Sequence, residues 1–220
     1  MTVRPRTVVF DMDGTLLDTE AIAIRSWVAA FAEHGIEIDR TVALCTIGCD
    51  PPVARAAYRK LLGDAPDYLA IQVRCGEIFH QTAEREGIPL KRGARQILSL
   101  LRREGVRLGL ATSTRRASAE PELLELGLHD LFEIRVYGDE VSERKPSPEI
   151  YLEAVRRLGL LPSPEIWAVE DSANGIRSAK TAGLSVAWVP DLQDMPPEIR
   201  ALADITSPHL DQLASHFELA

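Results

Sequence analysis

The sequence has few cysteines, few aromatic residues and no apolar run long enough to span a bilayer. Its 220 residues include three cysteines and 5% aromatic residues. Three cysteines without a CxxC pair do not make a disulfide framework and fit a reducing compartment. No signal peptide is expected, because residues 1–7 contain two arginines and two threonines but no apolar core. The sequence therefore predicts a cytoplasmic protein with no membrane partner.

An excess of basic charge is also missing. The chain carries 33 acidic and 25 basic residues, a formal net charge of −8. This balance argues against a nucleic-acid partner, since nucleic-acid-binding surfaces are usually basic. Hydrophobic residues make up 45% and charged residues 26%, as in ordinary globular proteins. The length suits one large domain, or one domain with an insertion, that folds without disulfide or zinc.

Short runs rich in β-branched and aromatic residues alternate with helix-period stretches along most of the chain. The predicted strands are residues 7–11, 106–111, 134–137, 166–169 and 184–189. The predicted helices between them are residues 94–104, 118–126, 148–158 and 172–182. Alternation of buried strands and helices predicts an α/β fold, a Rossmann-like parallel sheet with helices on both faces.

Residues 19–86 break this alternation. They contain helical patterns at residues 21–33, 52–62 and 68–86 and no convincing strand. An all-helical segment is therefore predicted to be inserted after the first strand. We expect an α/β core formed by residues 1–17 and 90–220, and a separate helical domain over residues 18–89.

The first candidate site follows the first predicted strand, where Asp11 and Asp13 precede Gly14 and Thr15. Ligands of open α/β sheets bind at the carboxyl ends of the strands. Two carboxylates two residues apart can face the same small volume, and their repulsion is relieved by a cation or a bound proton. Taken alone, the motif is equally typical of a solvated acidic turn.

Three further groups of polar residues follow later predicted strands. They are the hydroxyl residues 112–114, Lys145, and the pair Glu170 and Asp171. Each has an ordinary structural explanation: a helix N-cap, a solvated loop lysine, and acidic residues at a helix N-terminus. Together they lie at the ends of successive strands on one edge of the sheet, which favours a shared site.

This set of motifs resembles the haloacid dehalogenase-like superfamily of phosphotransferases. Similarity extends over the surrounding residues 9–20, 145–149 and 169–176, and overall from residue 7 to about residue 190. The helical insertion is similar to the cap domain of the subgroup that contains β-phosphoglucomutase and many sugar-phosphate phosphatases. The resemblance thus implies a catalytic core with a helical cap.

The resemblance implies a role for each acidic residue. Asp11 would be the nucleophile that accepts the phosphoryl group, and Asp13 the general acid and base. Mg²⁺ would be the cofactor, held by the Asp11 carboxylate, the Asp13 backbone carbonyl and the Asp171 carboxylate, with Glu170 in support. Asp18 would lie where the cap hinge begins.

The resemblance also implies the groups that hold the phosphate. Thr112 and the Ser113 backbone N–H would contact the transferred phosphoryl oxygens, and Lys145 would neutralise both Asp11 and the phosphate. Gly48 and Arg55 in the cap are expected to contact the remainder of the substrate. The implied partner is a small phosphorylated metabolite.

Departures from the mutases of the subgroup favour a phosphatase. Those mutases have a histidine where this chain has Ala23, and cationic residues where it has Ile47 and Pro51. The resemblance therefore implies a Mg²⁺-dependent phosphatase that hydrolyses a small metabolite, such as a sugar phosphate, through an aspartyl phosphate. A β-phosphoglucomutase-type phosphotransferase is the alternative, with Arg55 or Arg74 replacing the missing cations.

Two alternatives from other classes remain. A receiver-like signalling domain also phosphorylates an aspartate near a lysine, but such domains are shorter and carry their acidic residues on different strands. A non-catalytic binding protein is the second alternative, although competent residues occupy every motif position. The expected oligomeric state is a monomer.

Overall fold

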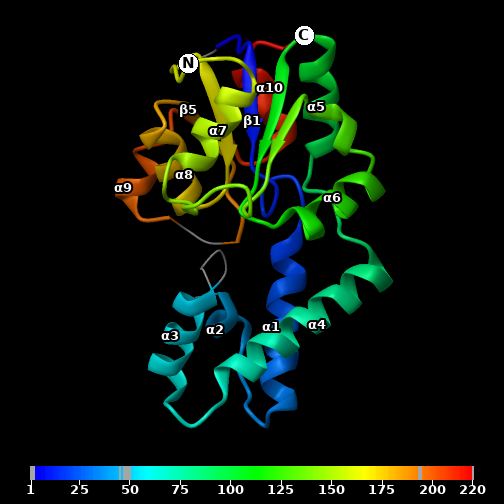
Figure 1. Ribbon diagram of the computed structural model, residues 1–220, viewed down its shortest axis with the longest axis vertical. Coiled ribbons are helices and arrows are strands. Elements are labelled where there is room, and N and C mark those ends of the chain that lie inside the picture. Colours follow the sequence, from blue (N-terminus) through cyan, green and yellow to red (C-terminus); the bar gives the residue numbers. More distant parts are fainter. Residues whose placement is uncertain (1–2, 45, 47–50, 193–194, 220) are drawn as a thin grey trace. The chain divides into compact units, whose positions relative to one another are not determined.

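The computed structural model describes residues 3–44, 46, 51–192 and 195–219 (Figure 1). Its contacts divide the chain into two compact units. The core unit consists of Met1–Leu17 and Leu90–Ala220, and the helical unit of Asp18–Pro89. No helix within the described ranges is long and apolar enough to cross a membrane.

The core unit is built on a six-stranded sheet with strand order β3-β2-β1-β4-β5-β6, in which every pair is parallel. The strands are β1 (Thr7–Phe10), β2 (Arg107–Ala111), β3 (Ile134–Val136), β4 (Ile166–Glu170), β5 (Ser185–Trp188) and β6 (Ile205–Thr206). The predicted Rossmann-like parallel sheet is confirmed. β6 was not predicted, because two residues are too few to show a pattern.

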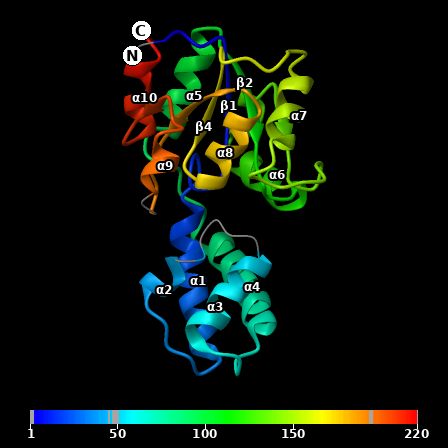
Figure 2. The same cartoon turned by 90° about the vertical axis from the view of Figure 1, so that its left-hand side faces the viewer.

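Helices cover both faces of this sheet. They are α5 (Ala94–Arg103), α6 (Arg116–Glu125), α7 (Glu149–Arg157), α8 (Ala173–Thr181), α9 (Pro197–Arg200) and α10 (Leu210–His216). Helices α5 and α10 pack together on one face, and α7 and α8 on the other (Figure 2). Every residue of β1, β4 and β5 is buried, which explains their continuous apolar runs.

The chain order of the strands places a switch point at the centre of the sheet. From β1 the chain moves outward to β2 and β3, then returns to β4 on the other side of β1. Val8 of β1 is paired with Leu108 of β2 and with Trp167 of β4. A crevice forms at the carboxyl ends of the strands at such a point, between β1 and β4.

The helical unit contains α1 (Thr19–Glu33), α2 (Arg40–Leu44), α3 (Pro51–Leu62) and α4 (Tyr68–Glu86), of which α2 was not predicted. Helices α1 and α4 pack together around an aromatic core. In that core the Phe31 ring lies 4.7 Å from the Tyr58 ring, and Trp27 lies 5.0 Å from Tyr58. Trp27 therefore has a packing role in this unit. At the start of α4, the Asp67 side chain caps the helix by accepting hydrogen bonds from two backbone N–H groups.

Candidate active site

Asp11 lies directly after β1, at the switch point of the sheet. Its backbone N–H donates to the carbonyl of Val169 over 3.0 Å, so the pairing of β1 with β4 continues one residue beyond the strand. The chain then turns, and the N–H groups of Leu16 and Leu17 both donate to the carbonyl of Met12. This turn leaves the Asp11 carboxylate almost completely buried.

Lys145 joins three elements at this point. Its ammonium nitrogen donates to Asp11 Oδ1 over 2.5 Å, to Glu170 Oε1 over 2.7 Å and to the carbonyl of Ala111 over 2.9 Å. The side chain is 5% exposed. Buried cations are normally paired, and here two carboxylates and a carbonyl share one ammonium group. Lys145 therefore connects the ends of β1, β2 and β4.

Glu170 is fully buried and held on both oxygens. Oε1 also accepts from the Tyr151 hydroxyl over 2.7 Å, and Oε2 accepts from the Ser172 hydroxyl over 3.1 Å. Ser172 in turn caps α8 by accepting from the N–H of Gly175. A Cβ on Gly175 would lie 1.9 Å from the Glu170 carboxyl group, so the helix can approach only because this residue is glycine. Glu170 is thus locked in one orientation.

Asp171 is held by residues on both sides of it. Its Oδ1 accepts from the Thr15 hydroxyl over 2.8 Å, and its carbonyl accepts from the Trp188 indole N–H over 3.2 Å. Gly14 adopts a φ of +75°, and a Cβ there would lie 2.4 Å from Asp171 Oδ2. Glycine is therefore required at this turn both for its backbone conformation and for the close approach of the carboxylate.

Asp13 lies against the hydroxyl residues after β2. Its Oδ2 accepts from the Thr114 hydroxyl over 2.7 Å and from the Thr112 hydroxyl over 3.2 Å. The Thr112 hydroxyl also accepts from the N–H of Thr114, so the two threonines form one local network. Ser113 lies between them, and its carbonyl is so close to Gly138 that no Cβ would fit there. Asp13 and the Thr112–Thr114 loop therefore form one side of the crevice.

Burial and like charge act together on these carboxylates. Burial raises the pKa of Asp11, Lys145 opposes this increase, and the nearby Glu170 and Asp13 add to it. Burial alone would lower the pKa of Lys145, but Asp11 and Glu170 outweigh it and hold that pKa above its usual range. The one ammonium group does not fully compensate the acidic residues, and a bound cation would complete the compensation.

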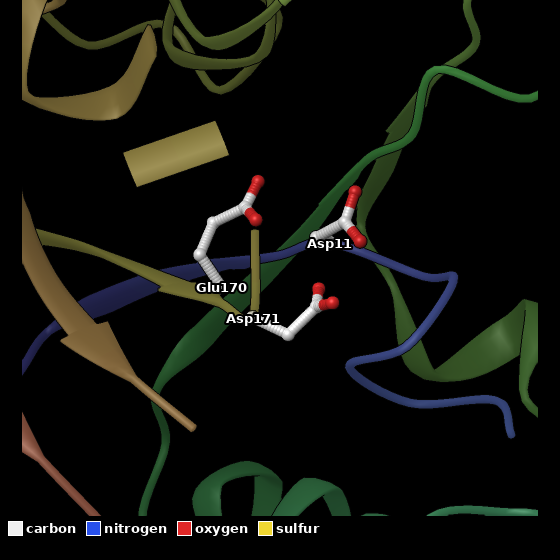
Figure 3. A group of neighbouring side chains, drawn as sticks. All are labelled: Asp11, Glu170 and Asp171. Atoms are coloured by element: carbon white, nitrogen blue, oxygen red, sulfur yellow. The ribbon is translucent and has the colours of Figure 1, made fainter. Parts of the chain in front are cut away.

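The arrangement of the acidic residues fits a divalent cation. Asp11, Glu170 and Asp171 each have a carboxylate oxygen within 4.8 Å of the others, at the ends of β1 and β4 (Figure 3). Because all of these ligands are oxygens, they suit a hard cation. Glu170 already accepts from Lys145, Tyr151 and Ser172, which leaves the Asp11 and Asp171 carboxylates best suited for direct coordination. The cluster can therefore bind a divalent metal ion.

The structure brings most of the predicted site residues together, but not all of them. Asp11, Asp13, Thr112, Lys145 and the Glu170–Asp171 pair share one network or lie beside it, with Ser113 in the adjoining loop. Gly48 lies outside the described residues. Arg55 belongs to the helical unit, where its guanidinium group donates to the side chain of Gln72.

Two residues of the network, Tyr151 and Ser172, were not among the predicted site residues, and both hold the Glu170 carboxylate. Thr15 and Thr114 belong to the predicted motif groups but were given no role, and they hold the carboxylates of Asp171 and Asp13. Ser172 lies next to a motif residue, and that adjacency could have identified it. Glu122 on α6 was not predicted either, and its pKa is raised to about 7 by burial and by the negative charges of Asp13 and Glu125.

Comparison with known proteins assigns this fold and site to a family. The family model described as "haloacid dehalogenase-like hydrolase" matches residues 5–183. This match covers most of the chain and includes every motif described above. The chain belongs to the haloacid dehalogenase-like hydrolase family.

Individual relatives agree with this assignment. The chain is 30% identical over 191 residues to the phosphorylated carbohydrates phosphatase of Thermotoga maritima, covering 80% of this chain and 81% of the relative. It is 31% identical over 201 residues to the validoxylamine A 7'-phosphate phosphatase of Streptomyces hygroscopicus subsp. limoneus, covering 91% and 92%. The crystal structure of CbbY from Rhodobacter sphaeroides in complex with phosphate matches with a TM-score of 0.74 and 28% identity, covering 95% and 96%.

Proposed function

We propose that this protein is a Mg²⁺-dependent phosphatase that hydrolyses a small phosphorylated metabolite through an aspartyl phosphate on Asp11. One observation carries this proposal. The Lys145 ammonium group donates hydrogen bonds to the carboxylates of Asp11 and Glu170, both of which belong to the acidic cluster. A cationic side chain fixed on a buried carboxylate is suited to a nucleophile that must approach a phosphate dianion. The family membership and the phosphatase names of two relatives support the reaction type.

In the first step, an Asp11 carboxylate oxygen attacks the phosphorus atom in line with the leaving alcohol. The bond between phosphorus and the alcohol oxygen breaks, and protonated Asp13 donates its proton to that oxygen. The alcohol leaves, and the phosphoryl group remains on Asp11. The hydroxyl of Thr114, which donates to Asp13 Oδ2 over 2.7 Å, fixes the carboxyl group for this transfer.

In the second step, Asp13, now a carboxylate, removes a proton from a water molecule that attacks the phosphorus atom. The bond between phosphorus and the Asp11 oxygen breaks, so inorganic phosphate leaves and both carboxyl groups return to their starting states. Dividing one difficult displacement into two is the advantage of a covalent intermediate.

Several groups stabilise the negative charge in both steps. A Mg²⁺ ion held by the Asp11 and Asp171 carboxylates and the Asp13 carbonyl would reduce the repulsion between Asp11 and the phosphate. Lys145 supplies a second positive charge on the same carboxylate. Thr112 and the Ser113 N–H at the end of β2 are the proposed contacts for the phosphoryl oxygens.

The substrate class rests on the names of the relatives and on the helical unit. The two curated relatives are named for phosphorylated carbohydrates and for a validoxylamine phosphate. We take a sugar phosphate as the substrate class on that basis. We further propose that the helical unit, residues 18–89, is a cap that covers the bound substrate and excludes water, hinged near Asp18.

A phosphatase is favoured over a mutase by the arginines of the helical unit. A mutase must hold a second phosphate, for which Arg55 and Arg74 were the candidates. Arg74 donates to both oxygens of Glu33 and to Glu77, and Arg55 donates to Gln72. Arg74 would have to leave its two carboxylate partners to bind a second phosphate, and Arg55 already directs one of its N–H groups to Gln72.

The test is the hydrolysis of a panel of sugar phosphates and other phosphomonoesters by the wild-type chain and by Asp11→Asn. We expect metal-dependent release of phosphate by the wild type, abolished by EDTA, and a loss of at least about a thousandfold in the variant. Asp130→Asn, at a side chain that is 97% exposed, is the control and should retain activity. Hydrolysis that survives both Asp11→Asn and EDTA would exclude the mechanism. Conversion of β-glucose 1-phosphate with a bisphosphate primer to glucose 6-phosphate, with little free phosphate, would instead identify a mutase.

A further inference from the structure

Asp191 is a buried carboxylate beside the site that none of the motifs includes. It follows β5 by three residues, and its side chain is 5% exposed. Its Oδ1 accepts from the Lys91 ammonium group. A carboxylate oxygen of Asp191 lies within 4.8 Å of a carboxylate oxygen of Asp171. Asp191 thus adds a third strand end, that of β5, to the acidic residues at the ends of β1 and β4.

The backbone around this ion pair is fixed on both sides. The N–H of Lys91 donates to the carbonyl of Leu16, in the loop that carries Asp11 and Asp13. On the other side, the N–H of Val189 donates to the carbonyl of Glu170 over 2.8 Å. Asp191 is therefore held in place relative to Asp171 by elements of the core unit alone.

The second oxygen of Asp191 is the unusual feature. Oδ2 is buried and has no hydrogen-bond partner in the part of the chain that the structure describes. Leaving an ionised oxygen buried without a partner costs more than a typical hydrogen bond contributes, so such atoms call for an explanation. A water molecule or an ion beside Asp171 would provide the missing partner.

Cation chemistry indicates what that partner is. Magnesium prefers six oxygen ligands and usually keeps several of its water molecules in protein sites. Those waters donate strongly and need acceptors around them, and such outer acceptors affect the metal affinity. Glu170 cannot readily serve, since Lys145, Tyr151 and Ser172 already occupy its oxygens.

We propose that Asp191, oriented by Lys91, is a positioning residue that accepts a hydrogen bond from a water molecule on the divalent cation and thereby strengthens cation binding. This inference rests on the proposed function through its cation site. It assigns a role to β5, which carries none of the four motifs. It also explains why a lysine is held beside a site that binds a cation: Lys91 orients one oxygen of Asp191 and leaves the other available.

The test measures cation binding without substrate, by calorimetric titration of Mn²⁺ and Mg²⁺ into the full chain. In Asp191→Asn the side chain retains an oxygen for Lys91 but presents an amide NH₂ where the acceptor was. We expect the Kd for both ions to rise by about 10- to 100-fold. Asp191→Ala should give the same result and serves as the second variant should one of them fold poorly.

Two controls separate this inference from the proposed function. Asp204→Asn makes the same change at another Lys–Asp pair of the core unit, that of Lys180 and Asp204, and should leave the Kd unchanged. Asp171→Asn should abolish binding. If Asp171→Asn binds as the wild type does, the proposed cation site itself is wrong. If Asp171→Asn loses binding while the Asp191 variants match the wild type, only the role of Asp191 is overturned.

Discussion

The ammonium nitrogen of Lys145 lies 2.5 Å from Asp11 Oδ1, although the two residues are 134 positions apart in the chain. Both side chains are buried, and the same ammonium group also holds Glu170. The pair therefore links the loop after β3 to the ends of β1 and β4. It serves the stability of the fold as well as the chemistry that we propose.

Lys145→Met tests the structural part of this role. The change would leave the Asp11 and Glu170 carboxylates buried without their cation, which should cost about 3–5 kcal/mol of unfolding free energy at pH 9 in EDTA. Burial already raises the pKa of Asp11 to about 8 with Lys145 in place, and loss of Lys145 would raise it further. The penalty should therefore be smaller at pH 5, where Asp11 is protonated in both folded proteins. Urea unfolding at both pH values measures this difference.

Lys180→Met is the matched control for that experiment. Lys180 pairs with Asp204, and the two side chains are 30% and 38% exposed. Loss of a pair this accessible to solvent should cost no more than about 1 kcal/mol at either pH. Equal losses in the two variants would show that the Lys145 network does not stabilise the fold.

The Tyr151 hydroxyl is predicted to hold Glu170 in place. Tyr151→Phe removes a 2.7 Å hydrogen bond to a fully buried carboxylate, and should cost about 1.5–3 kcal/mol of unfolding free energy. Tyr137→Phe provides the control, because the Tyr137 hydroxyl is also buried but has no hydrogen-bond partner within the described residues. That variant should be neutral or stabilised. Urea unfolding that ranks the two variants in the opposite order would contradict the network.

Glu122 is predicted to make stability depend on pH. Its folded pKa of about 7 lies above the ordinary value of 4.5, so the folded state binds the proton more tightly than the unfolded state. Stability is then lost as the pH rises from 4.5 to 7. Glu122→Gln should remove this loss and stabilise the protein by about 1 kcal/mol at pH 8, with no gain at pH 4.5, given its partial exposure.

Chemical unfolding across this pH range tests the Glu122 prediction, with the exposed Glu125→Gln as the control. Because Glu125 is only the smallest of the three causes that raise the Glu122 pKa, its variant should give a smaller gain than Glu122→Gln. Both variants remove one negative charge from α6. A gain of the same size at pH 8 in both would mean that net charge, rather than the burial of Glu122, is responsible.

Much of this fold could be predicted from the sequence, for a specific reason. Strands such as β4 are buried on both faces, so residues 166–169 form a continuous apolar run that is visible without a structure. In contrast, β6 contains two residues and pairs only through Ile205 and Thr206, too few for any periodicity. The short helix α2 was missed for the same reason.

The partners within the site were harder to predict than the motif residues. Asp11, Lys145 and Glu170 are polar residues at strand ends, where a site is expected in an α/β sheet. Tyr151 instead lies on α7 beside Ile150, and both residues are buried. In sequence it is indistinguishable from a core aromatic residue, and only the tertiary fold brings its hydroxyl to Glu170. Asp191 was not predicted as a site residue either, because nothing in the local sequence indicates that Lys91 or Asp171 lies beside it.

The central claim is that the phosphoryl group is transferred to Asp11 before it reaches water. The most direct test is the hydrolysis, in isotopically labelled water, of a phosphorothioate monoester made chiral by oxygen isotopes. Two successive in-line displacements, by Asp11 and then by water, each invert the phosphorus centre and together give net retention of configuration. We predict retention. Net inversion would show a single direct attack by water and would contradict the account.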